Sequence, residues 1–317
     1  MRAAQLVAPG RVELTEVTLP NPAPNEVRVR LEGCGVCASN VPPWEGRPWF
    51  SYPMAPGALG HESWGRIDAV GAEVMAFAPG ERVGVLSQNA YAQFDVAPES
   101  SVVRLPSKLS GDPFPAEPLG CALNIFRRSE IRRGQTVAII GIGFLGALLT
   151  QLASRKGARV LAISRRDFAL RTARTMGAAQ TISLGEKYRV VEQVRALTDG
   201  KFCDVVIEAV GKQEPLELAG ELSAERGRLV VAGYHQDGLR EVNLQLWNWR
   251  GLDVINAHER DPAIYREGMQ RAVDAVARGL LTPSLLYTHT FPLHQLGAAL
   301  RCTAERPDGF MKALIAL

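Results

Sequence analysis

Residues 136–146 read Thr-Val-Ala-Ile-Ile-Gly-Ile-Gly-Phe-Leu-Gly, and this stretch decides the fold class. Thr136–Ile140 predicts a short, wholly apolar strand, and the leucines of Leu145–Leu152 recur at the spacing of one helix face. The turn between them carries three glycines in the pattern G-x-G-x-x-G, namely Gly141, Gly143 and Gly146. A strand, a glycine turn and an amphipathic helix in this order are typical of a doubly wound sheet that binds a dinucleotide.

Each glycine of this turn has a separate physical role. Gly141 permits the tight turn, Gly143 lets the backbone approach a pyrophosphate, and Gly146 lets the helix pack against the strand. The helix that begins at Phe144 and Leu145 then presents its partial positive charge to the phosphates. These five residues are the predicted cofactor-binding loop.

The end of the next strand indicates which dinucleotide is bound. Sites for NAD usually place an acidic residue about 20 residues after the loop, to bind the ribose hydroxyls. Here Ser164, Arg165 and Arg166 occupy that place, and a hydroxyl beside guanidinium groups suits a 2′-phosphate. The sequence therefore favours NADP(H) over NAD(H). The alternative is that both arginines are solvated residues at a helix start.

The pattern on either side of the loop predicts an α/β protein of two domains. Short strands separated by Gly and Pro precede Gly134, and strand–helix alternation with apolar strands follows it. After Pro283 the chain becomes β-like again. We therefore expect a β-rich domain from residues 1–122 and 284–317, with a doubly wound domain, residues 123–283, inserted into it.

Composition excludes several classes of protein. The chain has 317 residues with 46% hydrophobic and 22% charged residues, the balance of a protein with a sizeable core. The formal charge of +3 is too small to indicate a nucleic-acid or membrane partner. Five scattered cysteines do not form a disulfide framework, so we expect a reduced, cytoplasmic location.

A set of metal-binding residue types lies in the first third of the chain. Cys37 is followed by the pair His61 and Glu62, and Glu117 ends the β-rich segment. Zinc accepts thiolate, imidazole and carboxylate ligands, and a catalytic site uses three of them plus an open position. Taken singly, each residue is better explained without a metal, as a buried cysteine, a hydrogen-bonded histidine and a surface carboxylate. Together, in this order, they predict a zinc site.

The chain resembles the zinc-dependent medium-chain alcohol dehydrogenase superfamily, especially its polyol (sorbitol) and threonine dehydrogenase branch. The resemblance covers essentially the whole chain and rests on Gly35–Asn40, Trp44–Gly46, Gly57–Glu62, Pro79–Val83, Glu117–Leu119 and Gly141–Gly146. It implies a GroES-like catalytic domain around a Rossmann domain.

The resemblance also implies roles for individual residues. Cys37 and His61 match zinc ligands, and Ser39 matches the hydroxyl that relays the proton of the alcohol. Glu117 matches the third ligand, although in polyol dehydrogenases Glu62 can ligate while Glu117 holds the zinc-bound water. The choice between Glu62 and Glu117 stays open.

Three departures from the family pattern bear on the site. Asn40 stands where the family usually has Asp, so a negative charge behind the zinc ligands is expected to be missing. Pro42 replaces a proton-relaying histidine. The stretch Arg82–Tyr91 is too short for the lobe that holds a structural zinc, so one zinc per chain is expected.

The implied function is reversible hydride transfer between a secondary alcohol or polyol and NADP(H). Two alternatives stand beside it: a metal-free enzyme similar to quinone reductases, and a non-catalytic nucleotide-binding sensor. Trp247 and Trp249 precede the strand Leu252–Ile255, which in this family pairs across a dimer. We therefore expect a homodimer or homotetramer, with a small-molecule substrate.

Overall fold

The computed structural model describes all 317 residues and divides them into two compact units. Unit 1 consists of Met1–Gly120 and Asp261–Leu317, and unit 2 of Cys121–Arg260. None of the helices is both long and apolar enough to cross a lipid bilayer.

The second junction between the units precedes the boundary expected at residue 283, because helix α8 (Pro262–Ala277) belongs to unit 1. Arg266 Nε of α8 donates to the carbonyl oxygen of Val102 at 3.2 Å. Gly120 also lies so close to α8 that a Cβ there would meet the Met269 nitrogen at 2.7 Å. These contacts tie α8 to the β-rich unit.

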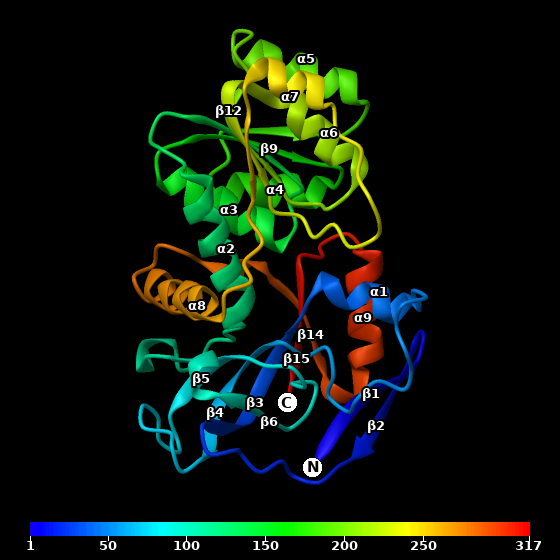
Figure 1. Ribbon diagram of the computed structural model, residues 1–317, viewed down its shortest axis with the longest axis vertical. Coiled ribbons are helices and arrows are strands. Elements are labelled where there is room, and N and C mark those ends of the chain that lie inside the picture. Colours follow the sequence, from blue (N-terminus) through cyan, green and yellow to red (C-terminus); the bar gives the residue numbers. More distant parts are fainter. The chain divides into compact units, whose positions relative to one another are not determined.

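Unit 1 is built on a seven-stranded sheet in the order β14-β15-β3-β4-β5-β7, with β6 also paired to β3. Its strands are β3 (Glu26–Val36), β4 (Glu62–Val70), β5 (Arg82–Leu86), β6 (Phe94–Pro98), β7 (Val102–Arg104), β14 (Tyr287–Pro292) and β15 (Lys312–Ala316), beside a hairpin of β1 (Arg2–Ala8) and β2 (Arg11–Glu16). Helix α9 (Leu296–Glu305) packs on β15 and beside the short helix α1 (Val41–Glu45), as Figure 1 shows.

Strand β3 is the centre of this sheet. Val27, Val29 and Leu31 are buried, while Arg28 and Arg30 between them are more exposed, the alternation of a strand with one covered face. Because β4 and β15 both pair with β3 in antiparallel register, residues far apart in sequence meet across it.

Unit 2 is a six-stranded parallel sheet in the order β10-β9-β8-β11-β12-β13. Its strands are β8 (Thr136–Ile140), β9 (Arg159–Ser164), β10 (Gln180–Ser183), β11 (Cys203–Glu208), β12 (Ser223–Val231) and β13 (Asp253–Asn256). Helices α3 (Phe144–Arg155) and α4 (Asp167–Thr175) pack together on one face (Figure 1). Helices α5 (Lys187–Leu197), α6 (Gln213–Leu222) and α7 (Leu244–Arg250) follow, and α2 (Ala116–Ser129) runs through the junction of the two units.

The predicted strand Thr136–Ile140 is confirmed as β8. Val137 to Ile140 are fully buried, because β9 and β11 flank the strand in parallel register and helices cover the sheet. This explains why its apolar residues run without alternation. The doubly wound fold expected from the glycine turn is therefore present.

Strands β6 and β14 of unit 1 each follow a segment that lacks strand geometry. Strand β6 begins only at Phe94, because Ala90 and Tyr91 donate their backbone N–H groups to a loop rather than to a sheet partner. The acceptors are the carbonyl oxygens of Gly60 at 2.9 Å and Gly57 at 3.1 Å. Strand β14 begins at Tyr287, after a 3-10 turn over Pro283–Leu286.

The glycine turn of unit 2 generates a stability prediction. A Cβ at Gly146 would lie 2.1 Å from the carbonyl oxygen of Gly141, whereas a Cβ at Gly143 would meet nothing within 4 Å. We expect Gly146→Ala to lower the free energy of unfolding by about 1–3 kcal/mol through overpacking. The control Gly143→Ala should change it by about 0.5 kcal/mol or less. Urea denaturation measures both, and equal stabilities would contradict the close approach of Gly146.

Candidate active site

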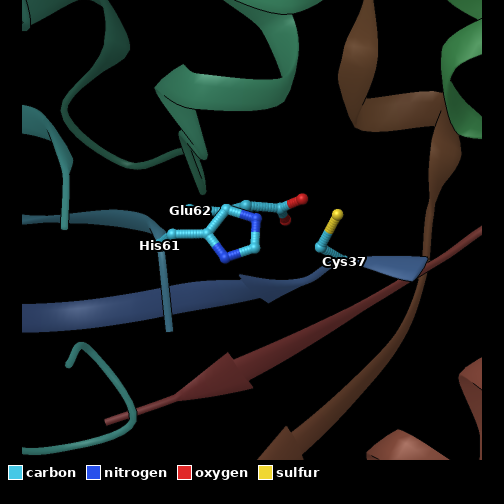
Figure 2. Close-up of side chains that lie close together, drawn as sticks. All are labelled: Cys37, His61 and Glu62. Carbon is cyan, nitrogen blue, oxygen red and sulfur yellow. The ribbon is translucent and has the colours of Figure 1, made fainter. Parts of the chain in front are cut away.

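Three side chains of unit 1 converge at one end of its sheet. Cys37 follows the last residue of β3, His61 immediately precedes β4, and Glu62 begins β4. Gly35 of β3 pairs with Glu62, so the end of one strand and the start of the other lie side by side. One potential ligand atom from each of the three side chains lies within 4.8 Å of the others (Figure 2).

A buried ammonium group completes this cluster. Lys312, the first residue of β15, donates from Nζ to Glu62 Oε1 at 2.7 Å and lies 2.5 Å from Oε2. Glu62 is 1% exposed and Lys312 is 5% exposed. Burial lowers the pKa of Lys312, but the negative charges of Glu62 and Cys37 outweigh burial and raise it. The lysine therefore remains a cation inside the sheet.

Gly35 makes room for this ion pair. It lies on β3 between its partners Glu62 on β4 and Leu314 on β15. A Cβ at position 35 would stand 1.9 Å from Glu62 Oε2. The glycine of the Cys34–Cys37 segment is thus required by the carboxylate that passes over it.

His61 is oriented by a main-chain acceptor. Its Nδ1 lies 2.8 Å from the carbonyl oxygen of Leu59, which can only accept, so Nδ1 carries a proton. Burial lowers the pKa of His61, but a hydrogen bond with Cys37 and the surrounding negative charges outweigh burial and raise the pKa to about 10. A metal ion bound at Nε2 would have to displace a proton there.

The remaining predicted residues of unit 1 lie nearby. Ser39 is half-buried in the 3-10 turn Ala38–Asn40, which directly follows Cys37. Glu117 is 8% exposed in the first turn of α2, and its negative charge raises the pKa of His61 and of Lys312. It does not belong to the group whose ligand atoms lie within 4.8 Å.

The donor set of this cluster fits zinc. A cysteine sulfur, an imidazole nitrogen and a carboxylate oxygen are the ligand types that zinc takes, and tetrahedral coordination separates such atoms by roughly 3.3–3.8 Å. The spacing within 4.8 Å requires only a small inward movement of the side chains. The buried ammonium of Lys312 limits the accumulated negative charge, since two of the three donors are anionic when they bind.

The predicted cofactor loop lies at the carboxyl end of β8 in unit 2. Gly141 has a φ of +98°, a conformation that side chains rarely adopt, and its N–H donates to the carbonyl oxygen of Ile163 at 2.9 Å. Gly143 caps the N-terminus of α3, whose first residues are Phe144 and Leu145. The helix N-terminus and the open space at Gly143 together suit an anion.

The three residues expected to select the nucleotide lie beside this loop. Ser164 ends β9, and its hydroxyl accepts the N–H of Arg166 at 3.3 Å. The Arg166 guanidinium donates to the carbonyl oxygen of Ile142 at 3.3 Å, so this side chain lies over the glycine turn. Arg165 is exposed and pairs with Glu214 at 2.8 Å. Unit 2 therefore brings a hydroxyl and two guanidinium groups to the edge where β8 and β9 end.

A second buried carboxylate joins the neighbouring loops of unit 2. Glu208, which is fully buried at the end of β11, accepts the N–H groups of Val210 and Gly211 and lies 2.9 Å from His235 Nε2. Arg240 Nε donates to His235 Nδ1 at 2.9 Å. These bonds hold together the loops that follow β11 and β12.

Lys312 and Gly35 are the site residues that the sequence reasoning missed. The signal for Lys312 was available, because a lysine opens an otherwise apolar terminal strand, Lys312–Ala316. Such a lysine is rarely buried without an acidic partner.

Comparison with known sequences gives two matches along the chain. Residues 23–107 match the alcohol dehydrogenase GroES-like domain family, and residues 145–276 match the zinc-binding dehydrogenase family. The two matched segments fall on either side of α2.

Individual proteins resemble the chain over most of its length. A sorbitol dehydrogenase of Halalkalibacterium halodurans is 24% identical, over 90% of this chain and 90% of the relative. A quinone oxidoreductase of Pseudomonas aeruginosa is 30% identical, over 77% and 75%. A zinc-binding dehydrogenase from Sinorhizobium meliloti, solved with NADP bound, superposes with a TM-score of 0.87 at 26% identity, covering 100% of this chain and 99% of that one.

The buried ion pair generates a second stability prediction. Lys312→Met leaves the Glu62 carboxylate buried without its cation, so we expect the free energy of unfolding to fall by about 3–5 kcal/mol. The exposed pair of Lys187 with Glu221 provides the control, and Lys187→Met should cost about 1 kcal/mol or less. Denaturation of metal-free protein measures both. Equal losses would show that burial does not set the strength of the Glu62 pair.

Proposed function

The chain belongs to the zinc-type medium-chain alcohol dehydrogenase superfamily and is an NAD(P)-dependent alcohol dehydrogenase. On this premise we propose that it transfers a hydride between a secondary alcohol or polyol and NADP(H), with one zinc ion bound per chain. The observation that carries the proposal is the convergence of Cys37, His61 and Glu62 within 4.8 Å beside a buried lysine.

In this proposal Cys37, His61 and Glu62 hold the metal. His61 contributes Nε2, since Nδ1 is bonded to the Leu59 carbonyl. Glu62 is preferred to Glu117 as the third ligand because its carboxylate belongs to the close group. Glu117 would then act on a water or substrate hydroxyl from the first turn of α2.

When bound, zinc supplies Lewis acidity that lowers the pKa of an alcohol and stabilises the alkoxide. The chain itself handles the proton and the orientation of the ligands. Ser39, two residues after Cys37, accepts the proton of the alcohol. Since Pro42 has no side chain that could relay this proton further, Ser39 passes it directly toward solvent. Lys312 keeps the Glu62 carboxylate in one orientation through contacts to both of its oxygens.

The hydride acceptor in this proposal is NADP⁺, held by unit 2. Gly143 leaves open space for the pyrophosphate at the start of α3. Gly141 and Gly146 instead allow the close packing of the turn and the helix around that space. Ser164 and Arg166 would bind the 2′-phosphate, because a guanidinium attracts a phosphate that a carboxylate at the same place would repel.

A second candidate function is NADPH-dependent quinone reduction without metal. The relative from Pseudomonas aeruginosa, a quinone oxidoreductase, favours it. The cluster around Cys37 favours the first candidate, because a metal-free reductase has no use for a thiol, an imidazole and a carboxylate in one place. Assays with secondary alcohols, polyols and quinones, each with and without zinc, distinguish the two.

We further infer that two chains associate through unit 2. Strand β13 lies at the edge of the sheet and pairs only with β12. Trp249 of α7, just before it in the chain, is 85% exposed. An open strand edge beside an exposed tryptophan suits a protein interface, and sedimentation velocity measures the resulting homodimer or homotetramer.

The zinc proposal predicts the behaviour of Cys37→Ser. Because serine is a poor zinc ligand, we expect metal content to fall from about one zinc per chain to near zero, and alcohol oxidation to be lost. NADPH binding should persist. Elemental mass spectrometry, turnover assays and nucleotide titration measure the three properties. Cys302→Ser, at a half-buried cysteine of α9, is the control and should behave as the wild type. Full activity of Cys37→Ser would overturn the zinc proposal.

The cofactor proposal predicts a selective effect of Arg166→Ala. Loss of a charge-assisted hydrogen bond should weaken NADPH binding by about 10- to 100-fold. NADH has no 2′-phosphate, so its affinity should stay nearly constant. Arg174→Ala, at an exposed position of α4, the helix that directly follows Arg166, serves as control. Equal losses for both nucleotides would mean that Arg166 does not select NADP(H).

A further inference from the structure

Asn40 lies behind the metal-binding cluster and bridges two of its segments. It is 2% exposed, at the end of the turn that follows Cys37. Its Nδ2 donates to the carbonyl oxygen of Leu59 at 3.2 Å. Its Oδ1 accepts the hydroxyl of Tyr91 at 2.7 Å. The amide thus donates on one side and accepts on the other.

The Leu59 carbonyl is also the acceptor that orients His61, at 2.8 Å from Nδ1. Leu59 has a φ of +74°, the left-handed region that a leucine rarely adopts. Such a conformation persists only where the surroundings hold it. Two sets of bonds do so here: the amide of Asn40, and the backbone bonds that Ala90 and Tyr91 make to Gly60 and Gly57.

Tyr91, the residue at the other end of this hydrogen-bond network from His61, is also held in place. Tyr91 is fully buried, and its hydroxyl also lies 3.3 Å from the carbonyl oxygen of Gly35, two residues before Cys37. The network therefore joins the segment that carries Cys37 to the segment that carries His61.

We propose that Asn40 is the positioning residue for His61, acting through the Leu59 carbonyl, and that this position requires a neutral amide. The inference rests on the proposed zinc function. A carbonyl oxygen can only accept, so it must face a donor. An ionised aspartate has no donor, and its oxygen would stand against the Leu59 oxygen at the distance where the amide nitrogen now lies.

This proposal reverses the expectation from the sequence alone. Because the family usually has Asp at this place, Asn40 reads there as a lost negative charge, and Asn40→Asp should then improve zinc binding. In the structure, however, the Leu59 carbonyl orients His61, and Asn40→Asp removes the hydrogen bond from Asn40 Nδ2 that holds this carbonyl in place. Asn40→Asp should therefore weaken zinc binding.

The test compares zinc affinity among variants of the full chain. Metal-free protein is titrated with zinc in competition with a chromophoric chelator, and its cobalt form is examined by visible absorption, which reports the ligand geometry. We expect Asn40→Asp and Asn40→Leu to weaken zinc binding by about 10- to 100-fold, with altered cobalt spectra. Tyr91→Phe, which keeps the amide but removes its support, should have a smaller effect in the same direction.

The control variant is Thr303→Val, which removes one buried hydrogen bond, from Thr303 to Ala299 within α9, and leaves the network intact. It should bind zinc as the wild type does, so a general loss of stability is separated from a loss of positioning. Asn40→Asp is close in shape to the native residue, and its thermal unfolding is recorded alongside.

The outcomes separate this inference from the proposed function. Zinc binding by Asn40→Asp that equals or exceeds that of the wild type overturns the positioning role and leaves the zinc function standing. Absence of zinc binding by the wild type overturns both. Weaker binding by Asn40→Asp and Asn40→Leu, with an unchanged Thr303→Val, supports the inference.

Discussion

The buried ion pair between Glu62 and Lys312 is the constraint on which the candidate metal site depends. Removing two charges from water is costly, and only their close contact offsets this cost. The contact requires β4 and β15 to flank β3 in their observed registers, and it requires a glycine at position 35. A shift of either strand by one residue would turn its charged group to the other face of the sheet. The pair therefore fixes the geometry at the strand ends that carry Cys37 and His61.

The two units present sites of opposite electrostatic character. In unit 1 a thiol, an imidazole and two carboxylates surround a single ammonium group, an environment suited to a cation. In unit 2 a helix N-terminus, a serine and two arginines lie at the ends of neighbouring strands, an environment suited to phosphate. Each unit also contains a buried carboxylate: Glu62 lies in the cluster of unit 1, and Glu208 joins the loops that follow β11 and β12 in unit 2.

What the sequence could predict was largely local. The strand Thr136–Ile140 and the glycine turn follow from patterns a few residues long, and Cys37 with His61 and Glu62 followed from motifs. The role of Lys312 was not predicted, because its partner Glu62 lies 250 positions away in the sequence and no periodicity links the two residues. The hydrogen bonding of Asn40 could not be predicted for a different reason. Its partner is the main-chain oxygen of Leu59, whose position depends on a left-handed φ. A leucine in the sequence gives no indication of this conformation.

Protein synthesis produces Glu62 long before Lys312, and all of unit 2 emerges between them. Unit 2 is continuous in sequence and can fold as an independent body from its own contacts while translation proceeds. The sheet of unit 1 can be completed only after β15 is synthesised, because pairing of β15 with β3 closes a loop that spans most of the chain. Until then the Glu62 carboxylate stays hydrated. The contact that orders the candidate site is accordingly among those that the chain can complete only when its last strand is made.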